Sequence, residues 1–354
     1  MLPTRLVEAA AVLLGLAFLG AQFPGPFALL DNLSNFPAHF GAAFLACAAL
    51  LAWRGRRAFA VAAAAAAALA LAPVLPWYLH RDADAPAASS PALKILVSNV
   101  YYANHRYGRI RRLVAEEDPD VVGLVEVSDR WLGKLEPLRD RYPHHVEIPD
   151  ESHVGLALYS RLPISDARAI RVGDRSTPAI AATLATPGGA IEILLAHPAS
   201  PIDAAAIRRR NAQIEALALH VRNADRPTLL AGDLNLTMWN RGYRPLEEVA
   251  RLHNARAGHG IGPTWPAFGR LGVPIDHILA TAEIDLWNFR VLRPVGSDHR
   301  PIVSEFALRE RRLALACPGM HAESASPPGR DLFRNSTERR CPAPPSSTAS
   351  GAPR

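Results

Sequence analysis

Cysteine is scarce in this chain of 354 residues, which contains three, and none of them lies between residues 92 and 308. This excludes a disulfide-built scaffold, a thiolate zinc module and a cysteine nucleophile in that region. The sequence also lacks a GxSxG nucleophile elbow and a GxxxxGK[ST] phosphate loop. There is no internal repeat, and apolar residues make up 49%, which excludes collagen, a coiled coil and wholesale disorder.

Lysine is nearly absent as well. Only Lys94 and Lys134 are lysines among 39 basic residues, a usage typical of a GC-rich coding bias. Residues 92–308 contain 26 Lys and Arg against 25 Asp and Glu, so most of the formal charge of +6 comes from the C-terminal flank. The net charge therefore gives no support to a nucleic-acid-binding face, which concentrates positive charge.

Long apolar stretches are present only near the N-terminus. They run from Leu6 to Phe23, from Phe36 to Trp53 and from Ala58 to Tyr78. Each approaches the ~20 residues that a helix needs to cross the ~30 Å hydrocarbon core of a bilayer. We expect residues 1–80 to form a membrane segment with three transmembrane helices. A cleaved signal peptide is the alternative for the first stretch.

Loop charge predicts the orientation of this segment. Arg54, Arg56 and Arg57 lie between the second and third stretches, whereas residues 24–35 contain no Lys or Arg. Loops rich in Lys and Arg stay in the cytoplasm. We therefore expect a multi-pass protein of the inner (cell) membrane whose remaining residues lie on the extracytoplasmic side.

Two segments of low complexity bound the remaining globular part, residues 92–309. Residues 81–91 are predicted to be a flexible linker, and residues 310–354 a disordered, basic tail rich in Pro and Ser. Cys317 and Cys341 lie in this tail and can pair in an oxidising compartment, although nothing in the sequence demands it.

The globular part alternates short apolar runs with helical segments. Helices are expected over 106–117 and 202–221, and some strands are joined by turns as short as residues 186–189. This mixture predicts an α/β sandwich instead of a regular βαβ winding. The expected strands are 93–100, 121–127, 154–160, 180–184, 191–197, 228–234, 275–280 and 301–307.

Polar residues with chemical potential follow these apolar runs. A carboxylate in such a place loses solvation unless it is paired or metal-bound. Any one of them can be a cap or a turn residue, but their recurrence at six strand ends indicates one active site. They are Asn99, Glu126, His197, Asp233 with Asn235, Asp276, and Asp298 with His299.

This series resembles the deoxyribonuclease I-like endonuclease/exonuclease/phosphatase superfamily over Leu93–Leu308. The resemblance is carried by GDLN (residues 232–235) and SDHRP (297–301), with GLALYSRLPI and IDHIL as lesser pieces. It implies a four-layer α/β sandwich of two packed mixed β-sheets flanked by helices. A helical anchor followed by such a domain also resembles a group of bacterial membrane proteins of unassigned substrate.

The resemblance also implies roles for the site residues. Glu126 and Asp298 would bind Mg²⁺, or Mn²⁺ in its place, with Asn99 contacting the metal or the phosphate. Oxygen ligands of this kind suit such hard cations. The other residues would be catalytic: His299 as general base oriented by Asp276, His197 as phosphoryl contact or acid, and Asp233 and Asn235 to position the nucleophile or leaving group.

The implied function is a membrane-anchored, divalent-metal-dependent phosphoesterase, with nuclease-like phosphodiester hydrolysis as its specific form. The substrate partner is a nucleic acid or a lipid head group. Pro198 and His277 depart from common family patterns, and these departures leave the substrate class open. One alternative is an esterase of phospholipids or small phosphate compounds. Another is a non-catalytic membrane interaction module. Arg210 is a solvated residue or a phosphate contact on the expected long helix.

Overall fold

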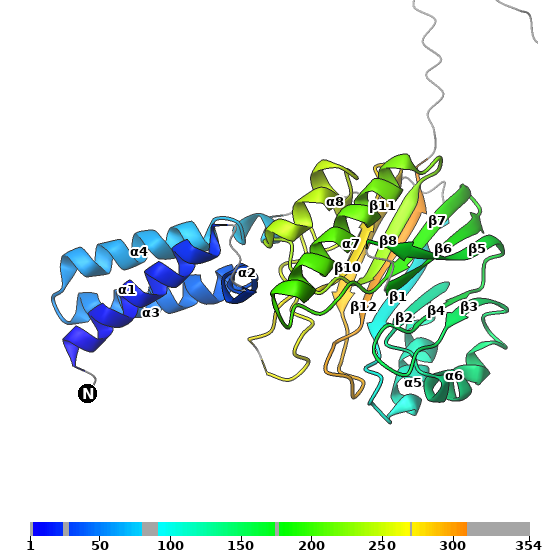
Figure 1. Cartoon of the computed structure of the whole chain (residues 1–354), viewed down its shortest axis with the longest axis horizontal. Helices are drawn as coiled ribbons and strands as arrows, with labels where there is room; N and C mark the ends of the chain where they lie inside the picture. Colours follow the sequence, from blue (N-terminus) through cyan, green and yellow to red (C-terminus); the bar gives the residue numbers. More distant parts are fainter. Residues whose placement is uncertain (1–2, 24–27, 80–90, 174–176, 270, 310–354) are drawn as a thin grey trace, which may run out of the picture. The chain divides into compact units, whose positions relative to one another are not determined.

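Two six-stranded β-sheets pack face to face in the computed structural model of the chain (Figure 1). The structure describes residues 3–23, 28–79, 91–173, 177–269 and 271–309. The predicted tail 310–354 with Cys317 and Cys341, and the predicted linker apart from its last residue, lie outside the described residues.

The first sheet has the strand order β11-β12-β1-β2-β4-β3. Its strands β1 and β2 are parallel and the other neighbours are antiparallel. The carboxyl ends of β1 and β2 therefore lie at the same edge. The strands are β1 (Leu93–Asn99), β2 (Val121–Val125), β3 (His144–Ile148), β4 (Leu156–Ser160), β11 (Ile284–Val291) and β12 (Ile302–Leu308).

The second sheet has the order β5-β6-β7-β8-β10-β9. Here β7 and β8 are parallel, and β10 runs antiparallel to β8. The carboxyl ends of β7 and β8 thus meet the beginning of β10. The strands are β5 (Ile164–Val172), β6 (Thr177–Thr186), β7 (Gly189–Ala196), β8 (Thr228–Asp233), β9 (His253–Asn254) and β10 (Asp276–Ala280).

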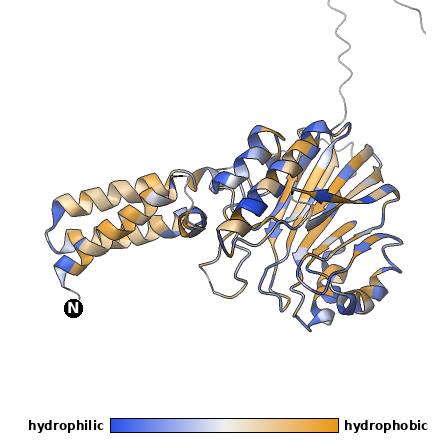
Figure 2. Cartoon of the chain, viewed as in Figure 1, coloured by the Kyte–Doolittle hydropathy of each residue, from blue (hydrophilic) through white to orange (hydrophobic). Residues whose placement is uncertain are grey.

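Alternation along the inner strands builds the layers. On β1, Ile95 and Val97 are buried in the core between the sheets, whereas Leu96 packs in a second core beneath α5 and α6. Helix α7 covers the second sheet through a third core, and Figure 2 shows apolar strands beneath its partly hydrophilic surface. The predicted α/β sandwich of two packed, helix-flanked sheets is confirmed. The helices are α5 (Tyr107–Glu117), α6 (Asp129–Leu135), α7 (Ala204–Asn223) and α8 (Arg244–Glu248), with short 3-10 turns η2 (Glu136–Leu138) and η3 (Arg241–Tyr243).

The N-terminal helices are shorter than their apolar stretches predict. Helix α1 is 18 residues long and apolar enough to cross a membrane, whereas α3 has 17 residues and α4 has 15. At 1.5 Å per residue, α1 spans about 27 Å, α3 about 26 Å and α4 about 22 Å, so α3 and α4 fall short of the length that α1 reaches. The expectation of three transmembrane helices is therefore wrong: among the described residues there is one candidate. The elements are α1 (Thr4–Ala21), α2 (Ala28–Leu33), α3 (Pro37–Trp53), α4 (Arg57–Leu71) and η1 (Leu75–Tyr78).

Proline sets the end of α4. The apolar stretch continues to Tyr78, but the helix ends at Leu71, just before Pro73, and Pro76 lies within the following 3-10 turn. Proline lacks an N–H and its ring clashes with the preceding turn, so it cannot lie within a continuing helix. Hydropathy therefore predicted a longer helix than the backbone allows.

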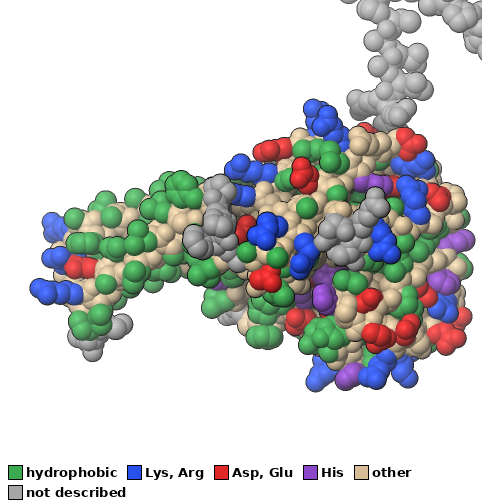
Figure 3. Space-filling view, viewed as in Figure 1, with side chains coloured by type: hydrophobic (Ala, Val, Ile, Leu, Met, Phe, Trp, Pro, Cys, Tyr) green, Lys and Arg blue, Asp and Glu red, His purple; other side chains and the backbone are tan. Residues whose placement is uncertain are grey.

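Alanine and phenylalanine side chains, with Val7 and Leu51, fill the contact between the N-terminal helices, and other large aliphatic side chains point outward. Ala63 and Ala67 of α4 are buried, whereas Leu13, Leu16 and Val61 keep more than 60% of their surface exposed. Figure 3 shows apolar side chains along the visible face of these helices, with charged side chains near the N-terminal end. A helix that is apolar on all sides needs an apolar surrounding.

Glycine is required where β7 and β8 end. Gly232 has a φ of +142°, and a Cβ there would lie 1.9 Å from the carbonyl oxygen of Ala196. We predict that Gly232→Ala lowers the free energy of unfolding by about 2–4 kcal/mol through strain and overpacking. Chemical denaturation of the full chain in detergent measures this. Gly133→Ala is the control, because Gly133 lies on exposed α6 with no atom within 4 Å of its added Cβ, and alanine should stabilise that helix slightly. Equal stability of the two variants would contradict the prediction.

Candidate active site

The two sheets are joined at one edge by an amide. Asn99 is the last residue of β1, and its register opposite Val125 places Glu126 beside it. The Asn99 Nδ2 donates hydrogen bonds to Oε1 of Glu126 at 2.8 Å and to Oδ2 of Asp233, on the other sheet, at 3.0 Å. Asn99 thus fixes the spacing between a carboxylate of each sheet.

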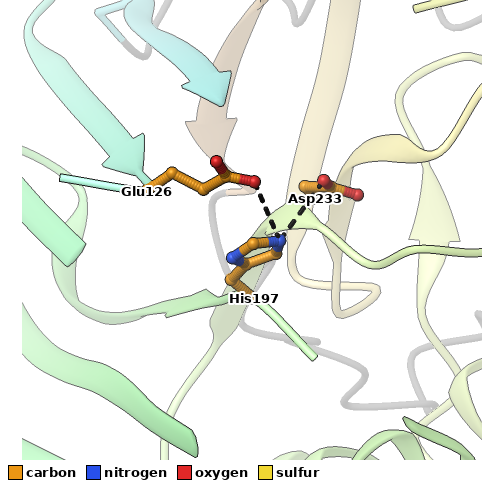
Figure 4. Close-up of side chains that lie close together, drawn as sticks. All are labelled: Glu126, His197 and Asp233. Atoms are coloured by element: carbon orange, nitrogen blue, oxygen red, sulfur yellow. Dashed lines mark ion pairs between the residues drawn. The ribbon is translucent and has the colours of Figure 1, made fainter. Parts of the chain in front are cut away.

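His197 lies between the same two carboxylates. The pairing of Leu195 with Ala231 sets His197 and Asp233 side by side, two residues further along β7 and β8. The His197 Nε2 is 3.4 Å from Oδ2 of Asp233 and 3.9 Å from Oε1 of Glu126, as Figure 4 shows. His197 and Asp233 are almost fully buried. Strand register alone therefore assembles this part of the cluster.

A second histidine reaches Asp233 from the other side. Asp276 faces Asp233 across the β8–β10 ladder. The His299 Nδ1 donates to Oδ2 of Asp276 at 2.9 Å, and its Nε2 lies 3.5 Å from Oδ2 of Asp233. The histidine and aspartate expected to act as a pair are thus hydrogen-bonded, with the other ring nitrogen aimed at the shared carboxylate.

Backbone conformation adds a signature at two of these residues. Glu126 and Asn235 have φ values of 62° and 55°, in the left-handed region that few residues other than glycine adopt. Such conformations are held only where the surroundings determine them, and they gather at functional sites. The Asn235 Nδ2 donates to the carbonyl oxygen of Pro198 at 3.0 Å and lies 3.2 Å from Nε2 of His197. These bonds hold the loop after β8 against the loop after β7.

Burial and charge oppose each other in the cluster. Burial acts to raise the pKa of Asp233, but His299 and His197 outweigh it and hold that pKa well below its ordinary value. Burial acts to lower the pKa of His299, yet Asp276 and Asp233 raise it to about 10. The pKa of His197 is also raised, because Asp233 and Glu126 outweigh burial. Asp233 is thus kept ionised by neighbouring positive charge. At Asp276 burial outweighs the charge of His299 and raises the pKa of the carboxyl.

The donor set fits a divalent cation. Glu126, His197 and Asp233 each offer a ligand atom, and these atoms lie within 4.8 Å of one another; Asp233, Asp276 and His299 form a second such group. Within the described residues, Nδ1 of His197 and Oδ1 of Asp276 are buried without a hydrogen-bond partner. The carboxylate oxygens of this set suit a hard cation such as Mg²⁺ or Mn²⁺.

Asp298 is placed differently from the other predicted ligands. Its Oδ2 accepts a hydrogen bond from the indole Nε1 of Trp265 at 3.2 Å, and Asp298 belongs to neither ligand group found among the described residues. The structure thus brings together seven of the eight predicted site residues and sets the Asp298 carboxylate beside them. Its role as a metal ligand stays a prediction.

Two buried arginines donate hydrogen bonds to the backbone of residues in the cluster. The Arg210 side chain is fully buried; it donates to the carbonyl oxygen of Asn235 at 3.1 Å and to Oδ2 of Asp31 at 2.9 Å. Arg256, also fully buried, donates to the carbonyl oxygen of Asp276 at 2.8 Å. The interpretation of Arg210 as a solvated residue or phosphate contact is wrong, because its guanidinium is buried and bonded to groups inside the protein. Asp31 carries no sequence signal for this role.

Comparison with known proteins agrees with this geometry. Residues 96–299 match the model of the Endonuclease/Exonuclease/phosphatase family. No curated protein sequence matches the chain significantly.

Solved structures share the fold at low sequence identity. Danio rerio TDP2 complexed with a single-strand DNA product is 17% identical, with a TM-score of 0.53, over 61% of this chain and 98% of that one. The human Nocturnin catalytic domain with bound sulfate is 20% identical, with a TM-score of 0.53, over 62% and 95%. An endonuclease/exonuclease/phosphatase from Beutenbergia cavernae is 22% identical, with a TM-score of 0.51, over 61% and 72%.

The donor set leads to a binding prediction. Mn²⁺ added to the metal-free full chain should raise its melting temperature, because a ligand that binds only the folded state at a hundredfold excess over Kd adds about 2.7 kcal/mol. Glu126→Gln should lose at least half of that shift, measured against its own metal-free form. Glu215→Gln, on the exposed face of α7, should keep it. Equal shifts in both variants would show that the cation binds elsewhere.

Proposed function

Because this chain belongs to the Endonuclease/Exonuclease/phosphatase family, whose members are hydrolases of phosphate esters, we propose that it is a membrane-anchored, divalent-cation-dependent phosphodiesterase. The observation that carries the proposal is the buried cluster of carboxylates and histidines contributed by both sheets. A non-catalytic module has no need of such a cluster, since ionised groups without solvent lower stability unless they are compensated.

Glu126 and Asp233 with Asn99 would hold the cation, and Asp298 is the further ligand predicted from the sequence. When bound, a divalent cation neutralises charge on phosphoryl oxygens and favours deprotonation of water. The protein contributes a dry site in which these ligands are already oriented by the hydrogen bonds of Asn99.

The remaining residues handle protons and orientation. In the hydrolysis, a water oxygen forms a bond to phosphorus, the bond from phosphorus to the leaving oxygen breaks, and the leaving oxygen gains a proton. His299 would take the water proton at Nε2 in its neutral form, while Asp276 holds its Nδ1–H. A bound cation would favour that form, because it would supply the positive charge that the carboxylates otherwise draw from His299. His197 would donate to a phosphoryl oxygen or to the leaving oxygen. Asp233 and Asn235 would orient the reacting water or leaving group.

Two substrate classes are candidates for this chemistry. Nucleic acid is favoured by likeness to Danio rerio TDP2, whose structure holds a single-strand DNA product. A lipid phosphoester is favoured by the apolar helices, since anchoring keeps an enzyme near substrates of the same membrane.

The apolar surface of the N-terminal helices supports the anchor. Helix α1 would cross the membrane. The shorter α3 and α4, packed against it, would enter the bilayer from the extracytoplasmic side as a hairpin, with local thinning of the bilayer at their turn. Arg56, at the α3–α4 turn, forms an ion pair with Glu8 of α1, so the basic residues of that turn lie beside the start of α1. By the positive-inside rule this end faces the cytoplasm of a bacterium, and the sheets lie on the extracytoplasmic side of the inner membrane.

Activity tests the proposal directly. The full chain in detergent with Mg²⁺ or Mn²⁺ should hydrolyse bis-p-nitrophenyl phosphate. His299→Ala should lower kcat roughly 100-fold or more, because a positioned proton carrier contributes about 10²–10⁴-fold. His153→Ala, at an exposed loop position, is the matched control and should retain activity. A stably folded chain that cleaves no phosphate ester would support the non-catalytic alternative.

Topology has its own measurement. Alkaline phosphatase, which is active only outside the cytoplasm, should be active when fused after residue 92, and green fluorescent protein fused there should be dark after export by the general secretion route. The fusions should also stay in the membrane after carbonate washing. Release into the wash would show that α1 acts as a cleaved signal sequence, and a fluorescent fusion would overturn the orientation.

A further inference from the structure

Two loops beside the site carry large apolar side chains that almost nothing covers. Ile202, Phe268 and Leu271 are 83%, 74% and 78% exposed. Among the described residues from 91 to 309, the other exposed large hydrophobic side chains reach only 38–44%. Large apolar side chains as exposed as these are unfavourable in water and indicate an apolar surface that meets them.

Both loops belong to the site. Ile202 lies in the segment that follows β7 and carries His197. Phe268 and Leu271 follow Trp265, whose indole donates to Asp298. Each loop therefore adjoins a residue of the catalytic cluster.

Each loop is also bonded to the N-terminal helices. The Asn32 Nδ2 of α2 donates to the carbonyl oxygen of Pro201 at 2.9 Å. The His39 Nε2, in the first turn of α3, lies 2.9 Å from the carbonyl oxygen of Leu271. The apolar side chains thus lie at the end of the N-terminal helices that is opposite the Arg56 turn. This is the end at which the helices contact the sheet domain.

Buried hydrogen bonds and an ion pair join the sheets to that end of the helices. Besides the Arg210–Asp31 ion pair, the backbone N–H of Thr237 donates to Oδ1 of Asn35 at 2.9 Å, and both residues are buried. Separating these surfaces would leave a guanidinium buried without its counter-ion, which is strongly unfavourable. The described residues from 3 to 309 accordingly belong to one compact unit.

We propose that the two loops enter the surface of the bilayer and that the site hydrolyses an amphiphilic phosphoester, a membrane lipid, whose hydrocarbon stays in the membrane while its phosphate reaches the cluster. This rests on the proposed function and on the membrane location of α1. The nearly balanced charge of residues 92–308 agrees, because it offers no general attraction to a polyanionic nucleic acid.

Insertion is tested without any activity. The full chain is reconstituted into vesicles of phosphatidylethanolamine and phosphatidylglycerol brominated on the acyl chains. Phe268→Trp should show fluorescence quenching beyond that of the parent chain, and Arg168→Trp, on the exposed strand β5, should show none. Both variants must melt at the parent temperature. Absence of added quenching at position 268 would overturn the proposal.

Substrate class is tested with two probes that share one leaving group. The first is water-soluble bis-p-nitrophenyl phosphate, and the second is a long-chain alkyl p-nitrophenyl phosphodiester embedded in vesicles. We expect kcat/KM to be higher for the embedded probe than for the soluble one. The double variant Phe268→Asp with Leu271→Asp should lower the ratio of embedded-probe to soluble-probe activity about tenfold, because apolar insertion is lost. Ile202→Asp should lower it in the same direction.

The outcomes separate the two proposals. If neither probe is cleaved, the proposed hydrolase function fails, while the quenching result still reports on insertion. If the soluble probe is cleaved and the embedded one is no better, or the ratio is unchanged in the variants, the membrane-lipid inference fails and the hydrolase stands. Preferential cleavage of single-stranded DNA or of RNA by the vesicle-bound chain would also overturn it.

Discussion

Negative charge enclosed between the two sheets is the constraint on which this structure depends. Asp233 is 1% exposed, and it is compensated by the Asn99 amide and by the imidazoles of His197 and His299. A carboxylate in such surroundings is tolerated only where every partner is in place. The strand registers, the left-handed backbone at Glu126 and the close approach allowed by Gly232 all serve that convergence. The same groups thus support both folding and the proposed chemistry.

The parts of the fold that could be predicted from the sequence are those in which burial leaves a continuous apolar run. Strands β1, β2, β7 and β8 lie inside the sheets and were located to within two residues at their ends. Strand β5, by contrast, is an edge strand exposed along most of its length, so it has no apolar run to reveal it. Strand β3, an outer edge of the first sheet that begins with His144 and His145, is mostly half-buried, and it too lacks a continuous apolar run.

The site could be predicted as far as residues at strand ends are concerned, because parallel strands deliver their carboxyl ends to one edge. Contacts made across long stretches of chain carry no local signal. Asp31 and Arg210 are 179 residues apart, and the indole of Trp265 reaches Asp298 over 33 residues. Arg210 lies close to His197 in sequence, but the face of α7 on which it lies points towards the interior. Helix lengths near the N-terminus depended on two prolines that a hydropathy average overlooks.

The ion pair between Asp31 and Arg210 gives the N-terminal helices a structural role in the sheet domain. Grafting the sheets onto a foreign anchor, or excising them as a fragment, would strip a structural counter-ion from beneath the loop that carries Asn235. The sequence suggests a division between anchor and enzyme at residues 81–91, but the ion pair between Asp31 and Arg210 joins the two sides of that division. In that respect the helices and the sheets depend on each other, and the loop that carries Asn235 is supported by a residue that precedes the sheets by some sixty positions along the chain.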